Sequence, residues 1–460
     1  MGDPLAAISP LDGRYAGRTA ALSEWASESA LMRARVQVEV EYLIALAELD
    51  EIDLSFDDDD CAALRSIYET FDAADAALIK QIETTGAAGY PATNHDVKAV
   101  EYFLRERIEL DVEVTPWIHF SLTSEDVNNL AYRILIRGAM CEVIRPAIRE
   151  VRSILRDMAA EYRSVPMLAR THGQPATPTT VGKEFAVYVS RLDRGIDRMD
   201  TAIEGLAGKL AGASGTYAAH HVAFPNVDWP AFAAAFVARF ELEHVPLTTQ
   251  VNPSDDLGAL FDAIVGVNQI LLDLDRDLWL YISDRYFGQS SDGNETGSST
   301  MPHKVNPIDF ENSEGNLSKA NADLRFLADY LRTSRLQRDL SDSTVKRNMG
   351  AALAHCLIGY QKSLAGLEKV VPNETVIAQD LADNPAVIAE AIQTVLRREG
   401  DPSAYERLKS ITRGESIQLE DLKAFVESLD VPADVKQMLE GLEPATYTGV
   451  AASLVDTIEE

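Results

Sequence analysis

The sequence predicts an all-α protein built on long helices. Apolar residues recur at helical spacing in five long stretches, whereas the alternation typical of strands is sparse. A chain of 460 residues with 46% hydrophobic and 7% aromatic content can also bury a large core. The five stretches are 124–163, 178–208, 253–286, 308–333 and 343–370.

A shorter helix is expected before the first long stretch. Its apolar face comprises Val97, Val100, Phe103, Leu104 and Ile108. Within the first long stretch, Pro146 predicts a kink, because proline lacks the amide hydrogen of the helical ladder and crowds the preceding turn.

Two interruptions divide the chain into three predicted domains. Val-Thr-Pro breaks the pattern near 114, and Val-Val-Pro-Asn near 370 precedes a more acidic tail. We expect an N-terminal helical domain (1–114), a central helical-bundle domain (115–370) and a C-terminal helical domain (371–460). Neither an internal repeat nor a low-complexity segment is evident.

Charge is the most unusual feature of the composition. The chain has 73 acidic and 42 basic residues, giving a formal charge of −31. This field disfavours nucleic acid and anionic membranes as partners. We expect adaptation to a salt-rich cytoplasm, since at about 1 M salt the screening length falls to about 3 Å. The alternative is an acidic protein without salt adaptation.

Other features favour a cytoplasmic protein. No stretch approaches the roughly 18 uninterrupted apolar residues of a membrane span, and the first ten residues lack the basic and apolar regions of a secretion signal. Cys61, Cys141 and Cys356 are isolated, odd in number and without metal-ligand spacing, which predicts reduced, small core residues.

A polar loop carries the most specific motif. Residues 297–307 read Gly-Ser-Ser-Thr-Met-Pro-His-Lys-Val-Asn-Pro and place hydroxyl, imidazole, ammonium and amide groups where two prolines prevent a helix. With the polar residues from 288 onward, the segment can act as a lid. An ordinary surface turn is the alternative.

Two helix starts carry polar residues with two possible roles. Thr123-Ser124-Glu125-Asp126 has the Thr-x-x-Asp spacing of a capping box, with aspartate in place of the usual Glu or Gln. The amides of such a helix start can equally bind a carboxylate, so both roles stay open. Capping by the Asn or the Asp would likewise explain Asn94-His95-Asp96, where the acid can also orient His95.

Two further segments suggest chemistry. His172 lies between glycine and proline residues, and an imidazole on a rigid turn suits proton donation near neutral pH; a surface histidine is the alternative. Residues 332–347 form a cationic island, in which Arg338, Ser343 and Arg347 can bind a phosphate group. The alternative is that the island is a solvated helix face with ion pairs to Asp339 and Asp342. His220-His221 lacks further ligands at metal spacing, so no metal is expected.

The loop motif resembles that of the fumarase/aspartase superfamily. Within it the chain is similar to the adenylosuccinate lyase family, on the strength of residues 9–15, the run Arg-Thr-His-Gly-Gln-Pro-Ala-Thr-Pro from 170, His303, and residues 308–312. The resemblance implies a three-domain, all-α fold with a central long-helix bundle. It also implies a homotetramer whose active sites each draw on three chains. A 30-residue helix of about 45 Å, which separates its two ends, agrees with such sharing.

The resemblance implies a β-elimination of fumarate in purine nucleotide biosynthesis. Adenylosuccinate would give AMP, and the succinylocarboxamide precursor (SAICAR) would give the aminoimidazole carboxamide nucleotide (AICAR), without a cofactor. Ser298 would be the general base and His172 the general acid, with Glu311 in a supporting position. The remaining positions would bind substrate: Arg14, Tyr15, Asn94, His95, Asp96, Thr123, Ser124, Gln250, Ser299, Lys304, Val305, Asn306, Asn312, Arg338, Ser343, Thr344, Val345, Lys346 and Arg347.

Two other functions remain open. The same fold can act on argininosuccinate or another amine adduct of fumarate, although the phosphate-binding arginines argue against this. A helical scaffold that retains the motifs without turnover is the second.

The sequence departs from the family pattern at two places. Residues 86–92 look like an insertion before Asn94, and Thr296 replaces an expected aliphatic residue.

Overall fold

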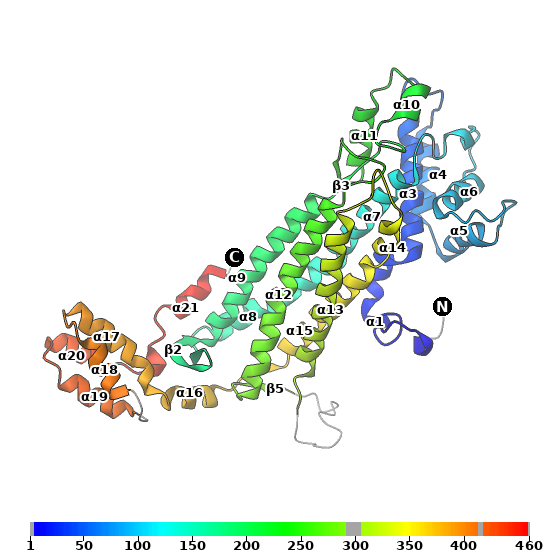
Figure 1. The fold of residues 1–460 in the computed structure, drawn as a ribbon. Coiled ribbons are helices and arrows are strands. Elements are labelled where there is room, and N and C mark those ends of the chain that lie inside the picture. Colours follow the sequence, from blue (N-terminus) through cyan, green and yellow to red (C-terminus); the bar gives the residue numbers. More distant parts are fainter. Residues whose placement is uncertain (1–3, 291–304, 413–416, 459–460) are drawn as a thin grey trace. The chain divides into compact units, whose positions relative to one another are not determined.

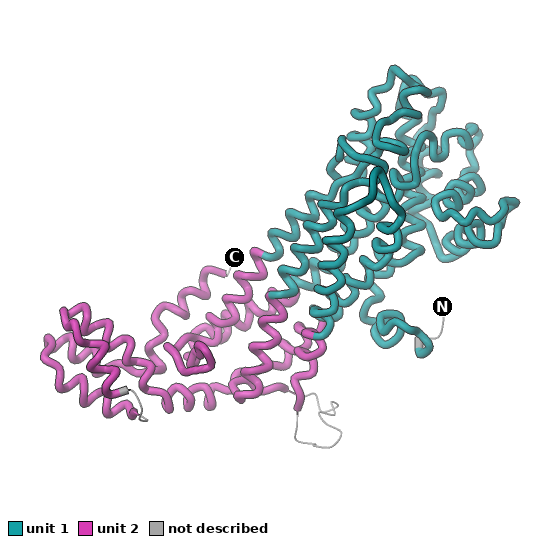
Figure 2. The backbone as a smooth tube through the Cα atoms, viewed as in Figure 1, with its two compact units in different colours: residues 1–148, 195–269, 315–360 teal, residues 149–194, 270–314, 361–460 magenta. Residues whose placement is uncertain are grey.

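A computed structural model describes residues 4–290, 305–412 and 417–458. The chain forms two compact units (Figure 2): unit 1 comprises residues 1–148, 195–269 and 315–360, and unit 2 comprises 149–194, 270–314 and 361–460. Helices dominate both units (Figure 1), which confirms the all-α fold class. The division into three domains stays a prediction.

The helices differ in how they relate to the units. Those within unit 1 are α1 Ala16–Thr19, α2 Ser23–Ala26, α3 Glu28–Ala47, α4 Asp58–Glu69, α5 Ala73–Thr84, α6 Asp96–Arg107, α7 Ser124–Ala139, α10 Ala218–Ala223, α11 Trp229–Ala238 and α14 Ser341–Lys346. Those with residues in both units are α8 Arg145–Glu161, α9 Val181–Glu204, α12 Asp255–Ser283, α13 Ile308–Leu331 and α15 Met349–Leu367. Those within unit 2 are α16 Glu374–Ala382, α17 Ala389–Arg398, α18 Ala404–Thr412, α19 Leu419–Glu427, α20 Ala433–Glu440 and α21 Ala451–Leu454.

The described residues also contain three small two-stranded sheets. In unit 2, β1 Pro166–Thr171 pairs antiparallel with β2 Gln174–Thr180, and β5 Phe287–Gln289 pairs antiparallel with β6 Val370–Pro372. In unit 1, β3 Ala207–Gly208 pairs parallel with β4 Glu243–His244. The sequence analysis did not predict any of these strands.

Acidic residues begin several helices of unit 1. Asp57 and Asp60 form a capping box at α4, and Asp72 and Asp75 form another at α5. In each box the side chains accept hydrogen bonds from amides that the helix itself leaves unpaired. Part of the acidic surplus therefore stabilises helix ends.

The core of unit 1 is centred on α3. This helix packs against α4, α5, α6 and α7. Gly138 of α7 lies so close to Trp25 that an added Cβ would come within 2.0 Å of the indole ring. The predicted apolar face of α6 is buried at its first four positions, but Ile108 lies beyond the helix end and is half-buried.

Three of the predicted long stretches are interrupted. A π-helical turn, Met140–Ile144, separates α7 from α8 one residue before Pro146, for which the sequence predicts a kink. Residues 178–180 belong to β2, so α9 begins at Val181. The stretch 343–370 is not one helix, because α14 ends at Lys346 and α15 starts at Met349. The side chain of Asn348 donates to the carbonyl oxygen of Thr344 at this break.

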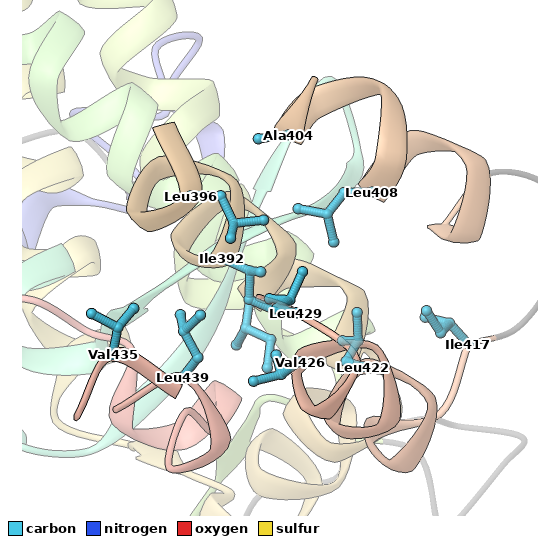
Figure 3. Packing of buried hydrophobic residues seen from close by; sticks show 11 residues of the cluster. Ile392, Leu396, Ala404, Leu408, Ile417, Leu422, Val426, Leu429, Val435 and Leu439 are labelled. Atoms are coloured by element: carbon cyan, nitrogen blue, oxygen red, sulfur yellow. The ribbon is translucent and has the colours of Figure 1, made fainter. Parts of the chain in front are cut away.

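Unit 2 has its own apolar core in the C-terminal helices. Leucine, isoleucine and valine side chains from α17, α19 and α20 converge with Leu408 of α18 (Figure 3). Their spacing places one face of each short helix inward. The hairpin β1–β2 lies elsewhere in unit 2, where β1 packs against α16.

Helix α12 is the one described helix long and apolar enough, by length and composition, to cross a membrane. However, 56% of its most apolar 18-residue window is buried inside the protein, as in the core helix of a globular protein.

Cys61, Cys141 and Cys356 are free thiols. Cys356 is buried as expected, but Cys61 and Cys141 are only half-buried.

A buried carboxyl group lies among hydroxyls in unit 2. The Ser363 hydroxyl donates to Asp275 Oδ1 at 2.9 Å, and Ser313 and Ser363 hydroxyls lie 2.8 Å apart. Asp275 Oδ2 has no hydrogen-bond partner among the described residues. Burial raises the pKa of Asp275 to about 7.

We expect Asp275→Asn to change how stability depends on pH. Because the folded pKa of Asp275 lies above its ordinary value, wild-type stability from this group is full below about pH 4 and is lost as pH rises to about 7. The asparagine variant does not lose this stability. The difference between its free energy of unfolding and that of wild type should therefore rise from about pH 4 to about pH 7, by at most about 1.4 kcal/mol for each unit by which the pKa is raised. Urea unfolding between pH 4 and 8 measures it. Asp284→Asn, at an exposed position after α12, is the control. Parallel profiles for Asp275→Asn and wild type would contradict the expectation.

Candidate active site

Predicted substrate residues from several segments of unit 1 come together in the structure. His95 caps α6: its Nδ1 accepts a hydrogen bond from the Lys98 amide at 3.2 Å. The neutral ring therefore carries its proton on Nε2, which lies 3.5 Å from the Ser124 hydroxyl at the start of α7. The cap of α6 is thus the imidazole of His95 and not Asn94 or Asp96, as the sequence suggests, and this imidazole also lies next to Ser124. Asn94, just before it, is exposed and has a positive φ of 49°.

Asp96 links two arginines beside this cap. Its Oδ2 accepts from Arg35 Nη2 at 2.7 Å and from Arg347 Nη2 at 3.1 Å. Burial disfavours the carboxylate, but the charges of Arg35 and Arg347 outweigh burial and lower the pKa of Asp96. Arg347 is therefore held next to His95 and Asp96, as expected for residues that share a site.

The cationic island is extensively paired with acids and amides. Arg338 Nη1 donates to Gln250 Oε1 at 3.2 Å, and Arg338 Nη2 lies 3.6 Å from Glu125 Oε2. Glu125 also accepts from the buried Lys346 at 3.0 Å. Glu125 directly follows Ser124, so these contacts join Gln250, Arg338 and Lys346 to the start of α7.

Pairing within the island also occurs, as the alternative interpretation expected. Arg335 lies 3.5 Å from Asp339, and Lys346 donates to Asp342 at 2.7 Å. Ser343 and Val345 are half-buried in α14, whereas Thr344 is exposed. Ion pairing and anion binding are compatible, because Arg338 and Arg347 keep 18% and 39% of their side chains exposed.

The acid at the start of α7 has a structural role. The Thr123 amide donates to Asp126 Oδ2 at 2.9 Å, which confirms that part of the expected capping box. The fully buried Asp126 carboxylate also accepts from the amides of Ala211 and Gly212, and pairs with buried Lys209 at 2.7 Å. This ion pair ties residues 209–212 to the helix start that presents Thr123 and Ser124.

Residues 86–92, which the sequence predicts to be an insertion, form a compact turn before Asn94. Gly86, Ala88 and Gly89 have positive φ, and the Tyr90 amide donates to the Ala87 carbonyl at 2.9 Å. The Tyr90 ring stacks on Tyr102 of α6 with centroids 4.2 Å apart. This segment is thus anchored on the helix that His95 caps.

Two N-terminal residues have no described hydrogen bond to this cluster. Tyr15 precedes α1 and is half-buried, and Arg14 is exposed. The structure therefore leaves their expected contact with phosphate a prediction.

Other predicted residues lie in unit 2. His172 is exposed at the turn of the β1–β2 hairpin, where His172 and Gly173 have φ of 54° and 72°. Two consecutive positive φ values are typical of a type I′ turn, whose twist matches antiparallel strands. The expectation of a histidine on a tight turn is confirmed.

The loop motif is described only at its ends. Ser298, Ser299, His303 and Lys304 lie outside the described residues. Val305 is exposed, Asn306 and Asn312 are half-buried, and Ile308 begins α13. Glu311 accepts from the Trp279 indole at 3.1 Å, which holds it on the surface of α13.

Sequence reasoning missed several residues that support the site. Arg35 is 1% exposed in α3, where its position within an apolar helix gave no sign of a partner 61 residues away. His119 precedes Thr123 in a loop, and its Nδ1 lies 2.5 Å from Glu39. Burial alone lowers the pKa of a histidine, but Glu39 outweighs burial and raises the pKa of His119. A buried acid in the apolar run of α3 was the available signal.

Comparison with known proteins identifies the family. Residues 13–321 match the family described as lyase, and residues 334–448 match the family described as adenylosuccinate lyase C-terminal. The chain is 46% identical to adenylosuccinate lyase from Dictyostelium discoideum, over 97% of each chain. The chain belongs to the adenylosuccinate lyase family.

Further adenylosuccinate lyases match over their full length. Identity is 46% with the protein from Haemophilus influenzae and 45% with that from Escherichia coli, in both cases over 99% of each chain. Two solved structures share the fold: a fumarate lyase from Mesorhizobium sp. BNC1 (TM-score 0.75, 20% identity, covering 95% of this chain and 97% of that one) and a 3-carboxy-cis,cis-muconate lactonizing enzyme from Pseudomonas putida (0.72, 21%, 95% and 96%).

Proposed function

We propose that the protein cleaves fumarate from adenylosuccinate, giving AMP, and from SAICAR, giving AICAR. The observation that carries this proposal is the identity of 44–46% to proteins named adenylosuccinate lyase along nearly the whole of both chains. Arg338 and Arg347, near the starts of α6 and α7, support it, because they offer guanidinium donors to a phosphate beside helix amides.

The proposed chemistry needs a base and an acid. Ser298 removes the proton from the carbon next to the bond that breaks, and the electron pair moves into the adjacent carboxylate. The carbon–nitrogen bond then cleaves, and His172 protonates the departing nitrogen. A free serine hydroxyl is too weak an acid for this task, so Lys304 and a closed loop that excludes water must stabilise the alkoxide. No step requires a cofactor.

The remaining residues divide by the part of the substrate that they bind. Lys304 and Asn306, together with Thr123, Ser124 and Gln250, hold the succinyl carboxylates. Donors aimed at the carboxylate that receives charge stabilise the transition state more than the substrate, and one such donor is typically worth about 10²–10³ in rate. The phosphate and ribose are held by Arg14, Tyr15, Arg338, Ser343 and Arg347. His95 and Asp96 orient the site, and Glu311 supports it.

A spectrophotometric assay with adenylosuccinate tests the reaction. Purified protein should release AMP and fumarate, identified by chromatography, in low-salt buffer, in molar KCl or in both. A folded protein that turns over argininosuccinate instead would replace the substrate assignment. Binding of AMP without release of fumarate from any of these substrates would favour a protein without catalytic activity.

We further propose a homotetramer with active sites shared between chains. Large apolar side chains are exposed on the long helices, as expected for surfaces that another copy covers. In unit 2 these are Val187, Trp279, Leu280 and Ile308, of which Ile308 is 56% exposed. Light scattering coupled to size-exclusion chromatography should give four chains, and an active monomer would contradict sharing of sites.

A salt-rich cytoplasm is the proposed setting. The net charge of −31 supports it, because carboxylate repulsion destabilises a compact protein unless ions screen it. The melting temperature should rise between dilute buffer and molar KCl. A melting temperature that stays constant or falls would remove the proposed salt adaptation.

A further inference from the structure

The cations proposed to hold phosphate already have partners in the structure. Four basic side chains of unit 1 face four acidic ones there. The bases are Arg35, Arg338, Lys346 and Arg347, and the acids are Glu28, Asp96, Glu125 and Asp342. A phosphate that approaches this cluster meets no net positive charge from these eight groups. Its binding must therefore overcome, or displace, at least one carboxylate.

The four acids differ in their freedom to move. The Glu125 and Asp342 side chains are 2% and 12% exposed, and both bind the buried ammonium of Lys346. Asp96 is 25% exposed, and the buried guanidinium of Arg35 fixes it from behind at 2.7 Å. Moving Asp96 would take the carboxylate from the buried Arg35, and moving Glu125 or Asp342 would remove one of the two carboxylates that bind the buried Lys346; weakening a buried ion pair in this way is costly.

Glu28 is different. Its side chain is 43% exposed, and within the described residues its only ion pair is with Arg347. Glu28 is also the first residue of α3, where the unpaired amides of the helix start favour a negative charge. A carboxylate released from Arg347 would thus still have water and the helix start to stabilise it.

We propose that Glu28 is the displaceable counter-ion of Arg347 and thereby sets the affinity of the site for nucleotide phosphate. The inference rests on the proposed function, because it takes Arg347 as a phosphate contact. Asp96 holds Arg347 in place in the empty and the occupied site. Glu28 accepts from Nη1 of Arg347, whereas Asp96 accepts from Nη2. Glu28 keeps this place until an anion replaces it, and the negative charge of Glu28 opposes that anion.

The substitution Glu28→Gln tests this role. AMP binding measured by titration calorimetry should tighten about two- to fivefold in low salt, the range expected for the loss of one partly exposed competing ion pair. The KM for adenylosuccinate should fall in the same proportion. In molar KCl, the dissociation constant for AMP and the KM of the variant should both approach the wild-type values, because exposed charges are then screened within about 3 Å.

Two controls separate this role from a general effect of charge. Glu24→Gln makes the same charge change at an exposed position of α2, where Arg33 contacts the main-chain oxygen of Glu24. It should leave the dissociation constant for AMP near that of wild type. In an Arg347→Met background, Glu28→Gln should no longer tighten AMP binding, because the cation for which they compete is absent.

The outcomes distinguish the inference from the proposed function. Wild-type protein that neither binds AMP nor cleaves adenylosuccinate would remove the proposed function. An active wild type whose Glu28→Gln variant binds AMP equally or more weakly would overturn the inference, and weaker binding would make Glu28 a residue that positions Arg347. Melting temperatures of all variants are compared with wild type. If Glu28→Gln does not fold, Glu28→Ser, which suits a first helical turn, is measured in the same way.

Discussion

Replacing His172 with asparagine is expected to lower kcat for adenylosuccinate by about 10²–10⁴, the usual contribution of a positioned general acid. The substitution is chosen for the backbone at this position. His172 has φ of 54° at the hairpin turn, and asparagine tolerates such values better than most residues. The hairpin should therefore form, while the amide cannot supply the proton that the departing nitrogen needs.

The measurement compares kcat with the affinity for AMP. Affinity should stay within a few-fold of wild type, because the imidazole acts mainly in the chemical step. His221→Asn is the matched control, since His221 is an exposed histidine in the last turn of α10 with no proposed role. A kcat within tenfold of wild type for His172→Asn would dispose of His172 as the acid.

The Lys209→Met substitution should destabilise the protein by about 3–5 kcal/mol, the cost of removing one partner from a buried ion pair. Neither side chain of the Lys209–Asp126 pair has exposed surface, and their charged atoms lie 2.7 Å apart. Methionine fills a similar volume but leaves the Asp126 carboxylate without its cation. The amides of Thr123, Ala211 and Gly212 remain as donors to this carboxylate. They offset part of the loss.

Urea unfolding at one fixed protein concentration measures the loss, because oligomer stability depends on concentration. The double variant Lys209→Met with Asp126→Asn should recover part of the stability, since no buried charge is then left unpaired. A single-variant loss below about 1 kcal/mol would show that the amides alone suffice for Asp126.

Local signals predicted much of the fold. The apolar spacing of Val97, Val100, Phe103 and Leu104 was sufficient for α6, because a helix must bury one stripe of its surface. Pro146 predicted a kink in this stretch, and the structure has a π-helical turn just before it, since the missing amide of a proline affects its own helix. The break between α14 and α15 was not foreseen, because no proline indicates it and the contact of Asn348 with Thr344 is made by a side chain.

The sequence by itself determined the family and supplied the prediction of the site residues, since the loop motif, His172 and the arginines of residues 332–347 are continuous or closely spaced in the chain. Only the tertiary structure decided which partners hold them. Arg35 meets Asp96 across 61 residues, Lys346 meets Glu125 across 221, and Arg347 meets Glu28 across 319. Such pairs leave no periodic pattern, because each forms where two helix faces meet and depends on the packing of the whole unit. Burial then fixes the strength of each pair, and burial is a property of the folded chain.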